Sequence, residues 1–165
     1  LPYFFATPVL AVDTQRKWLY VAYARGSRDA AWDLVIAASK DSGATWKRST
    51  LAGDGCALHM VPTLALDAAT GTLHIAYYDS EGAPGRFAHA TCGPGVTKCK
   101  LLGAISSVTA PVLSLARSTT KSVGDYESLL VDNKRKILHA VWAQSVDEAG
   151  KPVTRIFHAA AKLKK

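Results

Sequence analysis

The sequence has only three cysteines and one methionine in 165 residues, and it lacks several patterns that would assign a function. No run of 18 consecutive apolar residues occurs, so we expect no membrane span. No His-x-His or His-Glu-x-x-His spacing marks a metal site, and no Gly-x-Ser-x-Gly marks a nucleophile elbow. We therefore predict neither a metal nor a cofactor.

The positive charge is not concentrated in one segment. Lys and Arg number 20 against 13 Asp and Glu, which gives a formal net charge of +7. Apart from Lys162, Lys164 and Lys165, the basic residues do not cluster with aromatic residues between them, as they do in typical nucleic-acid-binding elements. We expect no nucleic-acid partner, since such a charge bears on solubility and non-specific contacts.

Three segments of the chain repeat one pattern. Each has an apolar run, an Asp, a polar turn and a second apolar run; they cover residues 8–23, 62–77 and 127–142. Asp13, Asp67 and Asp132 take the same position, at spacings of 54 and 65 residues. Short strands and turn signals at such periods predict a propeller or an array of similar units.

Further short apolar segments complete each unit. A third segment covers residues 33–39, 86–92 and 155–161, and a fourth covers residues 46–51 and 99–102. Helical periodicity is not sustained anywhere. We therefore predict an all-β fold of three four-stranded antiparallel blades, approximately residues 8–51, 62–102 and 126–165, in one domain of residues 1–165. The third unit ends at its third strand, because residues 161–165 are too short and too charged for a good outer strand.

The turn between the third and fourth strands of the first unit reads SKDSGATW, residues 39–46. Ser39, Asp41, Gly43 and Trp46 give it a pattern that resembles the Asp-box of sialidase-like (BNR-repeat) β-propellers. The resemblance implies a structural hairpin in which the Asp bonds N–H groups of its own turn, the Gly has positive φ and the Trp packs between strands. A calcium loop and a catalytic Asp41 are the alternatives. Thr50 stands where an EF-hand has its closing Glu, and the family's box lies opposite the active site.

Cys92 and Cys99 take the positions of Ser39 and Trp46 in the second unit, with Gly-Pro-Gly between them as a turn signal. Facing positions on a hairpin can reach disulfide geometry. We predict a Cys92–Cys99 disulfide, and hence a secreted, periplasmic or cell-surface protein, since disulfides persist in oxidising compartments. Residues 1–7 lack the basic region of a signal peptide. Two buried free thiols are the alternative, and Cys56 is left as a buried thiol or a link to another chain.

The resemblance implies a ring of six blades, of which this chain supplies three. Either the chain is the C-terminal half, completed by an N-terminal fragment of the same precursor, or a second copy completes it. In the second case residues 1–7 of each copy would complete the last blade of the other. Gly124-Asp125-Tyr126 resembles the last blade of sialidase-like propellers, which favours the first alternative.

Sialidases resemble one another in an arginine triad, a tyrosine nucleophile with a glutamate base, and an acid/base aspartate. The N-terminal Arg-Ile-Pro motif is absent from this chain. Arg86 and Arg155, at the starts of the third strands, are candidate ligand-binding residues, because a guanidinium pairs bidentately with a carboxylate. Tyr126, a candidate ligand contact, lies between Asp125 and Glu127, and these three are the weak catalytic candidates. The alternatives are solvated arginines and a channel-lining tyrosine.

The ligand face is expected on the loops between second and third strands, residues 24–32, 79–85 and 143–154, and on residues 52–61 and 103–126. His74 and His139, like His89 and His158, occupy equivalent positions in different units and are predicted to be packing residues. No complete catalytic set can be assembled. We predict a non-catalytic glycan- or protein-binding or assembly module with a glycan ligand. The alternatives are part of a sialidase-type glycoside hydrolase whose catalytic residues lie mostly on the missing half, and a structural domain of a surface filament or adhesin.

Overall fold

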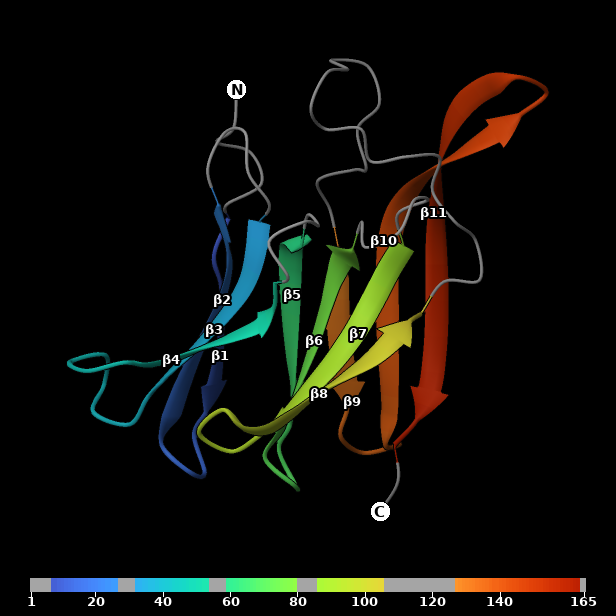
Figure 1. Ribbon diagram of the computed structural model, residues 1–165. Coiled ribbons are helices and arrows are strands. Elements are labelled where there is room, and N and C mark those ends of the chain that lie inside the picture. The colour runs from blue at the N-terminus through green and yellow to red at the C-terminus, as the bar shows by residue number, and fades with distance from the viewer. Residues whose placement is uncertain (1–6, 27–31, 54–58, 80–85, 106–126, 164–165) are drawn as a thin grey trace.

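The computed structural model describes residues 7–26, 32–53, 59–79, 86–105 and 127–163, and every helix or strand assigned within these ranges is a strand. Figure 1 shows three antiparallel sheets side by side. Blade 1 contains β1 (Val9–Asp13), β2 (Trp18–Gly26), β3 (Trp32–Ser39) and β4 (Lys47–Ala52). Blade 2 contains β5 (His59–Asp67), β6 (Thr72–Asp79), β7 (Arg86–Gly93) and β8 (Thr97–Ala104). Blade 3 contains β9 (Ser128–Asp132), β10 (Ile137–Glu148) and β11 (Lys151–Lys162).

The predicted all-β architecture is confirmed. The strands of each sheet follow one another in sequence order, and blade 3 has three strands within the described residues. The three sheets do not close into a ring, so the described chain forms a partial propeller. Each blade presents two faces because successive side chains of a strand point to opposite sides.

The first two strands of each blade are joined by the same tight turn, which we call the inner turn. Its Asp accepts backbone N–H bonds from the turn itself: Asp13 from Gln15 and Arg16, Asp67 from Ala69, and Asp132 from Lys134 and Arg135. The residue before the second strand has a left-handed φ, which is 60° for Lys17, 75° for Gly71 and 58° for Lys136. The repeat seen in the sequence is thus also a repeat of backbone conformation.

Side chains from two adjacent inner turns reach the inner turn of blade 2. Arg16 of blade 1 donates from Nη1 to the carbonyl of Ala68 and from Nη2 to that of Ala69, both at 3.0 Å. Lys136 of blade 3 donates from Nζ to Oδ1 of Asp67 at 2.9 Å. Burial favours a higher pKa for Asp67, but the bonds from Lys136, Thr70 and Ala69 outweigh it and lower the pKa. We call these contacts the inner-turn bridges, and they fix the spacing of neighbouring blades.

Apolar side chains fill the two spaces between the blades. Between blades 1 and 2, the fully buried Tyr20, Leu34 and Ile36 pack against Leu73 and Ile75. Between blades 2 and 3, four aromatic rings form a continuous series. The ring centroids are 5.1 Å apart for Tyr78–Phe87, 5.1 Å for Phe87–Trp142 and 5.7 Å for Trp142–Phe157. These layers hold the sheets in place.

The prediction of a loop at residues 143–154 is wrong. β10 runs to Glu148 and β11 starts at Lys151, so the two strands form one long hairpin with Ala149 and Gly150 at its tip. Both tip residues have positive φ, 52° and 77°, which is the conformation that the tightest hairpin turns require. Arg155 therefore lies inside β11 and not at the start of the third strand.

Candidate ligand-binding face

The turn at residues 39–46 closes on itself through its own side chains. The Asp41 carboxylate accepts from the Thr45 backbone N–H at 2.8 Å and from the Thr45 hydroxyl at 2.5 Å. The Ser39 hydroxyl donates to Asp41 and accepts from the Gly43 N–H at 2.9 Å, while the Trp46 indole donates to the Gly43 carbonyl at 2.9 Å. Gly43 has the expected positive φ, 94°. The bonds of Asp41 to its own turn and the positive φ of Gly43 agree with what the resemblance implied.

The bonds from Thr45 and Ser39 lower the pKa of Asp41 to about 2. Hydrogen bonds to a carboxylate stabilise its charged form. The hydrogen bonds of the Asp41 carboxylate are therefore made within its own turn. Across the residues described, no group of three or more His, Cys, Asp or Glu side chains is arranged to hold a metal ion.

Cys92 and Cys99 form a disulfide that closes the corresponding hairpin of blade 2, as predicted. Their Cα atoms are 4.1 Å apart, and Cys92 is buried against blade 1. The Tyr20 hydroxyl accepts the N–H of Gly95, the residue at the hairpin tip, at 3.1 Å. The equivalent hairpins of blades 1 and 2 are thus stabilised differently, by side-chain hydrogen bonds in blade 1 and by a disulfide in blade 2.

Reducing the Cys92–Cys99 disulfide should lower the free energy of unfolding modestly. The two cysteines are seven residues apart in the sequence. A disulfide that closes so short a loop restricts the unfolded chain less than one that closes a 15-residue loop, for which the stabilisation is about 3 kcal/mol. The measurement is urea unfolding of oxidised and reduced protein, after non-reducing peptide mapping has identified the bond. A peptide linking Cys92 to Cys56 would contradict the pairing.

Each blade carries a cross-strand pair of polar residues on its second and third strands, in the part of the blade away from the inner turn. The pairs are Arg25 and Asp33 in blade 1, Asp79 and Arg86 in blade 2, and Gln144 and Arg155 in blade 3. These positions lie at the end of the blades opposite the inner turns, in the upper part of Figure 1. We call this the loop-bearing end.

Arg86, a predicted ligand-binding residue, is held by a buried carboxylate. Its Nε and Nη2 lie 3.0 and 2.9 Å from Oδ2 of Asp79. The other oxygen of Asp79 lies 3.4 Å from Nδ1 of His59, and both His59 and Asp79 are 3% exposed. His59 in turn packs edge-on against Tyr77. The sequence identified Arg86 but gave no sign of His59, which becomes visible only once β5 is paired with β6.

Arg155 is bound more superficially. Its Nε and Nη2 each lie 2.7 Å from an oxygen of Glu148, and both side chains are about half exposed. The bond lowers the pKa of Glu148 and raises that of Arg155. Gln144, opposite Arg155, is buried and accepts the Trp142 indole N–H at 3.1 Å. In blade 1, Arg25 donates to Asp33 at 2.8 Å.

Of the predicted cluster Asp125, Tyr126 and Glu127, the structure describes only Glu127. Tyr126 and Asp125 lie outside the described residues, as do Cys56 and residues 1–6. Glu127 is described: it directly precedes β9 and is partly buried. The role of these three residues stays a prediction.

The histidines form pairs within blades, which the sequence did not suggest. Nδ1 of His74 lies 3.2 Å from Nε2 of His89 in blade 2, and Nδ1 of His139 lies 3.2 Å from Nε2 of His158 in blade 3. The two ring planes make an angle of 15° in both pairs. Burial lowers the pKa of His74 and of His89, the latter to about 4. The contact between the two partners depends on the register between their strands, which the repeat alone does not give.

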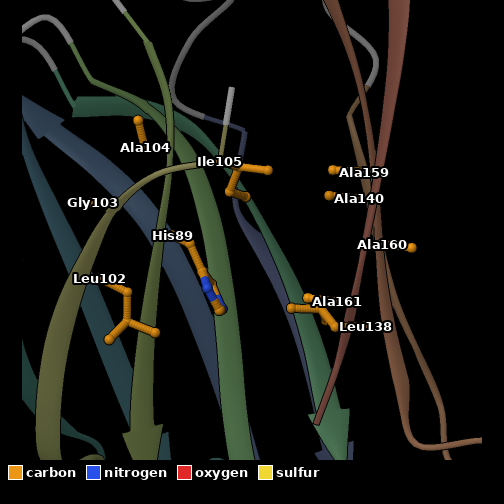
Figure 2. A pocket seen from close by; sticks show the side chains of 10 residues that line it. All are labelled: His89, Leu102, Gly103, Ala104, Ile105, Leu138, Ala140, Ala159, Ala160 and Ala161. Carbon is orange, nitrogen blue, oxygen red and sulfur yellow. The ribbon is translucent and has the colours of Figure 1, made fainter. Parts of the chain in front are cut away.

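A hollow of about 280 Å³ opens between blades 2 and 3. Figure 2 shows His89 and the β8 residues Leu102, Gly103 and Ala104 on one side, with Ala159 and Ala161 of β11 on the other. The lining is mostly alanine and glycine and has His89 as its one ionisable side chain. The hollow borders β11, the third strand of blade 3. In blades 1 and 2 a fourth strand pairs with the third strand, whereas β11 has no such neighbour within the described residues. We interpret the hollow as a gap in the sheet packing.

No protein-family model matches the chain, and no curated protein matches it by sequence. Among solved structures, the Hadza microbial sialidase Hz136 matches with a TM-score of 0.63 at 15% identity, over 94% of this chain and 35% of its own length. A Trypanosoma rangeli sialidase matches with a TM-score of 0.49 at 10% identity, over 96% of this chain and 31% of its own. The chain thus spans about a third of the sialidases it matches. The likeness to the first shows a sialidase-type propeller fold.

The described part of the chain contains no helix long and apolar enough to cross a membrane. The Cys92–Cys99 disulfide is compatible with an extracellular protein.

Proposed function

We propose that the chain is a non-catalytic binding module of a secreted, BNR-repeat, sialidase-like propeller, and that its loop-bearing end holds a glycan or a protein surface. One observation carries this proposal. The arginines at that end, Arg25, Arg86 and Arg155, each lie in an ion pair with a carboxylate of their own blade.

Such pairs suit a neutral polar ligand better than an anion. A guanidinium has five N–H donors and a carboxylate accepts about four bonds, so a fixed pair can still bond hydroxyl groups. Binding an anionic sugar as a sialidase does would require the arginines to exchange their carboxylates for that of the ligand. Among the described residues, the paired arginines therefore support recognition of hydroxyl-rich sugars or polar protein surfaces.

Replacing Arg155 with alanine should weaken binding about tenfold or more, because a hydrogen bond to a charged group contributes about 1.5–3 kcal/mol. The measurement is binding of labelled protein to arrayed neutral and sialylated glycans, alongside release of fluorophore from a sialic-acid glycoside. The control is Arg48→Ala, an exposed arginine on β4. Turnover of the sialoside, or an equal loss in both variants, would contradict the proposal.

A further inference from the structure

The face of blade 3 that points away from blade 2 exposes apolar side chains whose counterparts in blades 1 and 2 are buried. Ile156 occupies the position of Leu34 in blade 1 and Phe87 in blade 2; Leu34 and Phe87 are 0% exposed, whereas Ile156 is 70% exposed. Val141, at 36%, likewise corresponds to Ala22 and Ala76, both at 0%. In blades 1 and 2 these positions are covered by the following blade. Blade 3 therefore carries one half of a blade–blade interface.

The face of blade 1 that points away from blade 2 is the other half. Leu10 and Val12 are 63% and 50% exposed. Their counterparts in blade 3, Leu129 and Val131, are 7% and 6% exposed because blade 2 covers them. Large contiguous apolar patches are uncommon on protein surfaces that have no partner.

The inner turns at the two open ends are complementary in charge. Lys136 reaches back to Asp67 of the preceding blade; Lys17 is its counterpart in blade 1, with the same left-handed φ. The counterpart of Asp67 in blade 3 is Asp132, which keeps 20% of its side chain exposed. A blade 1 placed after blade 3 would thus set Lys17 against Asp132.

A second bridge repeats in the same way. Arg16 donates to the carbonyls of Ala68 and Ala69 in the following blade. Its counterpart Arg135 is paired with Asp132 in the same manner as Arg16 with Asp13, and its side chain is 76% exposed. The carbonyls it would meet on a following blade 1 belong to Thr14 and Gln15.

We propose that two copies of this chain close one ring, the open face of blade 3 of each copy docking on the open face of blade 1 of the other. A second copy supplies both missing halves at once, with two identical interfaces related by a twofold axis, the commonest symmetry of oligomers. Each interface continues the apolar layer and the inner-turn bridges that already join blades 1, 2 and 3. The ring then contains six sheets.

The test uses the purified 165-residue chain and light scattering over a dilution series. The wild type should have twice the chain mass. Lys17→Glu and Asp132→Lys should each raise the dissociation constant at least tenfold, and an equimolar mixture of the two variants should recover the wild-type affinity. In that mixture each interface again joins a cation to an anion. Lys98→Glu, an exposed lysine with φ of 49° on β8, is the matched control and should leave the mass unchanged.

Asp132 also bonds its own turn, so a second variant separates docking from folding. Ile156→Lys changes a side chain that is 70% exposed in one copy and should give a folded monomer, with the β-sheet circular dichroism of the wild type. A wild type that stays monomeric at about 100 μM overturns the proposal. It is likewise overturned if the K17E and D132K mixture stays monomeric, or if K98E dissociates the particle as K17E does.

Discussion

Replacing Phe87 with alanine should lower the free energy of unfolding by about 3–5 kcal/mol, the range for removing a buried aromatic ring. Phe87 is fully buried, and its ring lies 5.1 Å from those of both Tyr78 and Trp142. The change removes apolar contact area and leaves a cavity in the layer between blades 2 and 3. Urea unfolding followed by tryptophan fluorescence and by circular dichroism measures the effect, and agreement of the two probes checks for a single transition.

Two further variants test whether the loss of stability in Phe87→Ala comes from the buried volume that it removes. Phe87→Leu keeps much of the volume and should cost clearly less than Phe87→Ala. Leu101→Ala removes a side chain that is 53% exposed on β8 and should stay within about 0.5 kcal/mol of the wild type. A cost below about 1 kcal/mol for Phe87→Ala would mean that blades 2 and 3 do not pack on this face in solution.

Acidification from pH 6.5 to 4 should destabilise the protein through the buried His74–His89 pair. Burial lowers the pKa of both rings in the folded chain, that of His89 from 6.5 to about 4. The unfolded chain therefore binds more protons in this interval, so the stabilisation is complete above pH 6.5 and is lost as the pH falls to about 4. At about 1.4 kcal/mol per pKa unit, His89 accounts for a loss on the order of 3 kcal/mol.

The measurement is the urea midpoint as a function of pH for the wild type and for His89→Ile. Isoleucine is the residue that blade 1 has at the equivalent position, Ile36. H89I should flatten the profile between pH 6.5 and 4. His158→Gln, measured on dilute protein, is the control, because it removes a histidine with the same ring contact on the open face of blade 3. An unchanged slope in H89I would show that other groups cause the acid sensitivity.

The repeat made most of the fold predictable from the sequence. The aligned Asp13, Asp67 and Asp132 predicted three equivalent turns, and the aligned Cys92 and Cys99 predicted a disulfide where blade 1 has the turn of Ser39 to Trp46. Both inferences depend on local chain conformation, which a repeated local pattern records well.

The long β10–β11 hairpin was missed because the repeat places a loop between the second and third strands of every unit, and Pro152 lies in that segment. A proline cannot donate to a strand ladder, but it is tolerated on an edge strand. β11 is the edge strand of blade 3 within the described residues, and β10 is its only neighbour there. The sequence carries the proline but does not show that the strand lies at an edge.

Contacts that depend on register were also missed. His74 lies opposite Thr91, and His89 lies opposite Ala76, so the two rings meet diagonally across β6 and β7. Likewise, His59 comes close to Asp79 only through the pairing of β5 with β6. Single-sequence patterns give the face of a strand on which a residue lies, but not its neighbour on the next strand.

The order of strands within the blades has a consequence for the kinetics of folding. Within the described ranges, every strand of blades 1 to 3 pairs only with strands adjacent to it in the sequence. Proteins with such local strand pairing have a lower contact order than β-sandwiches of similar size, in which distant segments must pair, and are expected to fold faster than these. The strands of each blade can therefore begin to pair once that blade has left the ribosome, before the later blades are synthesised.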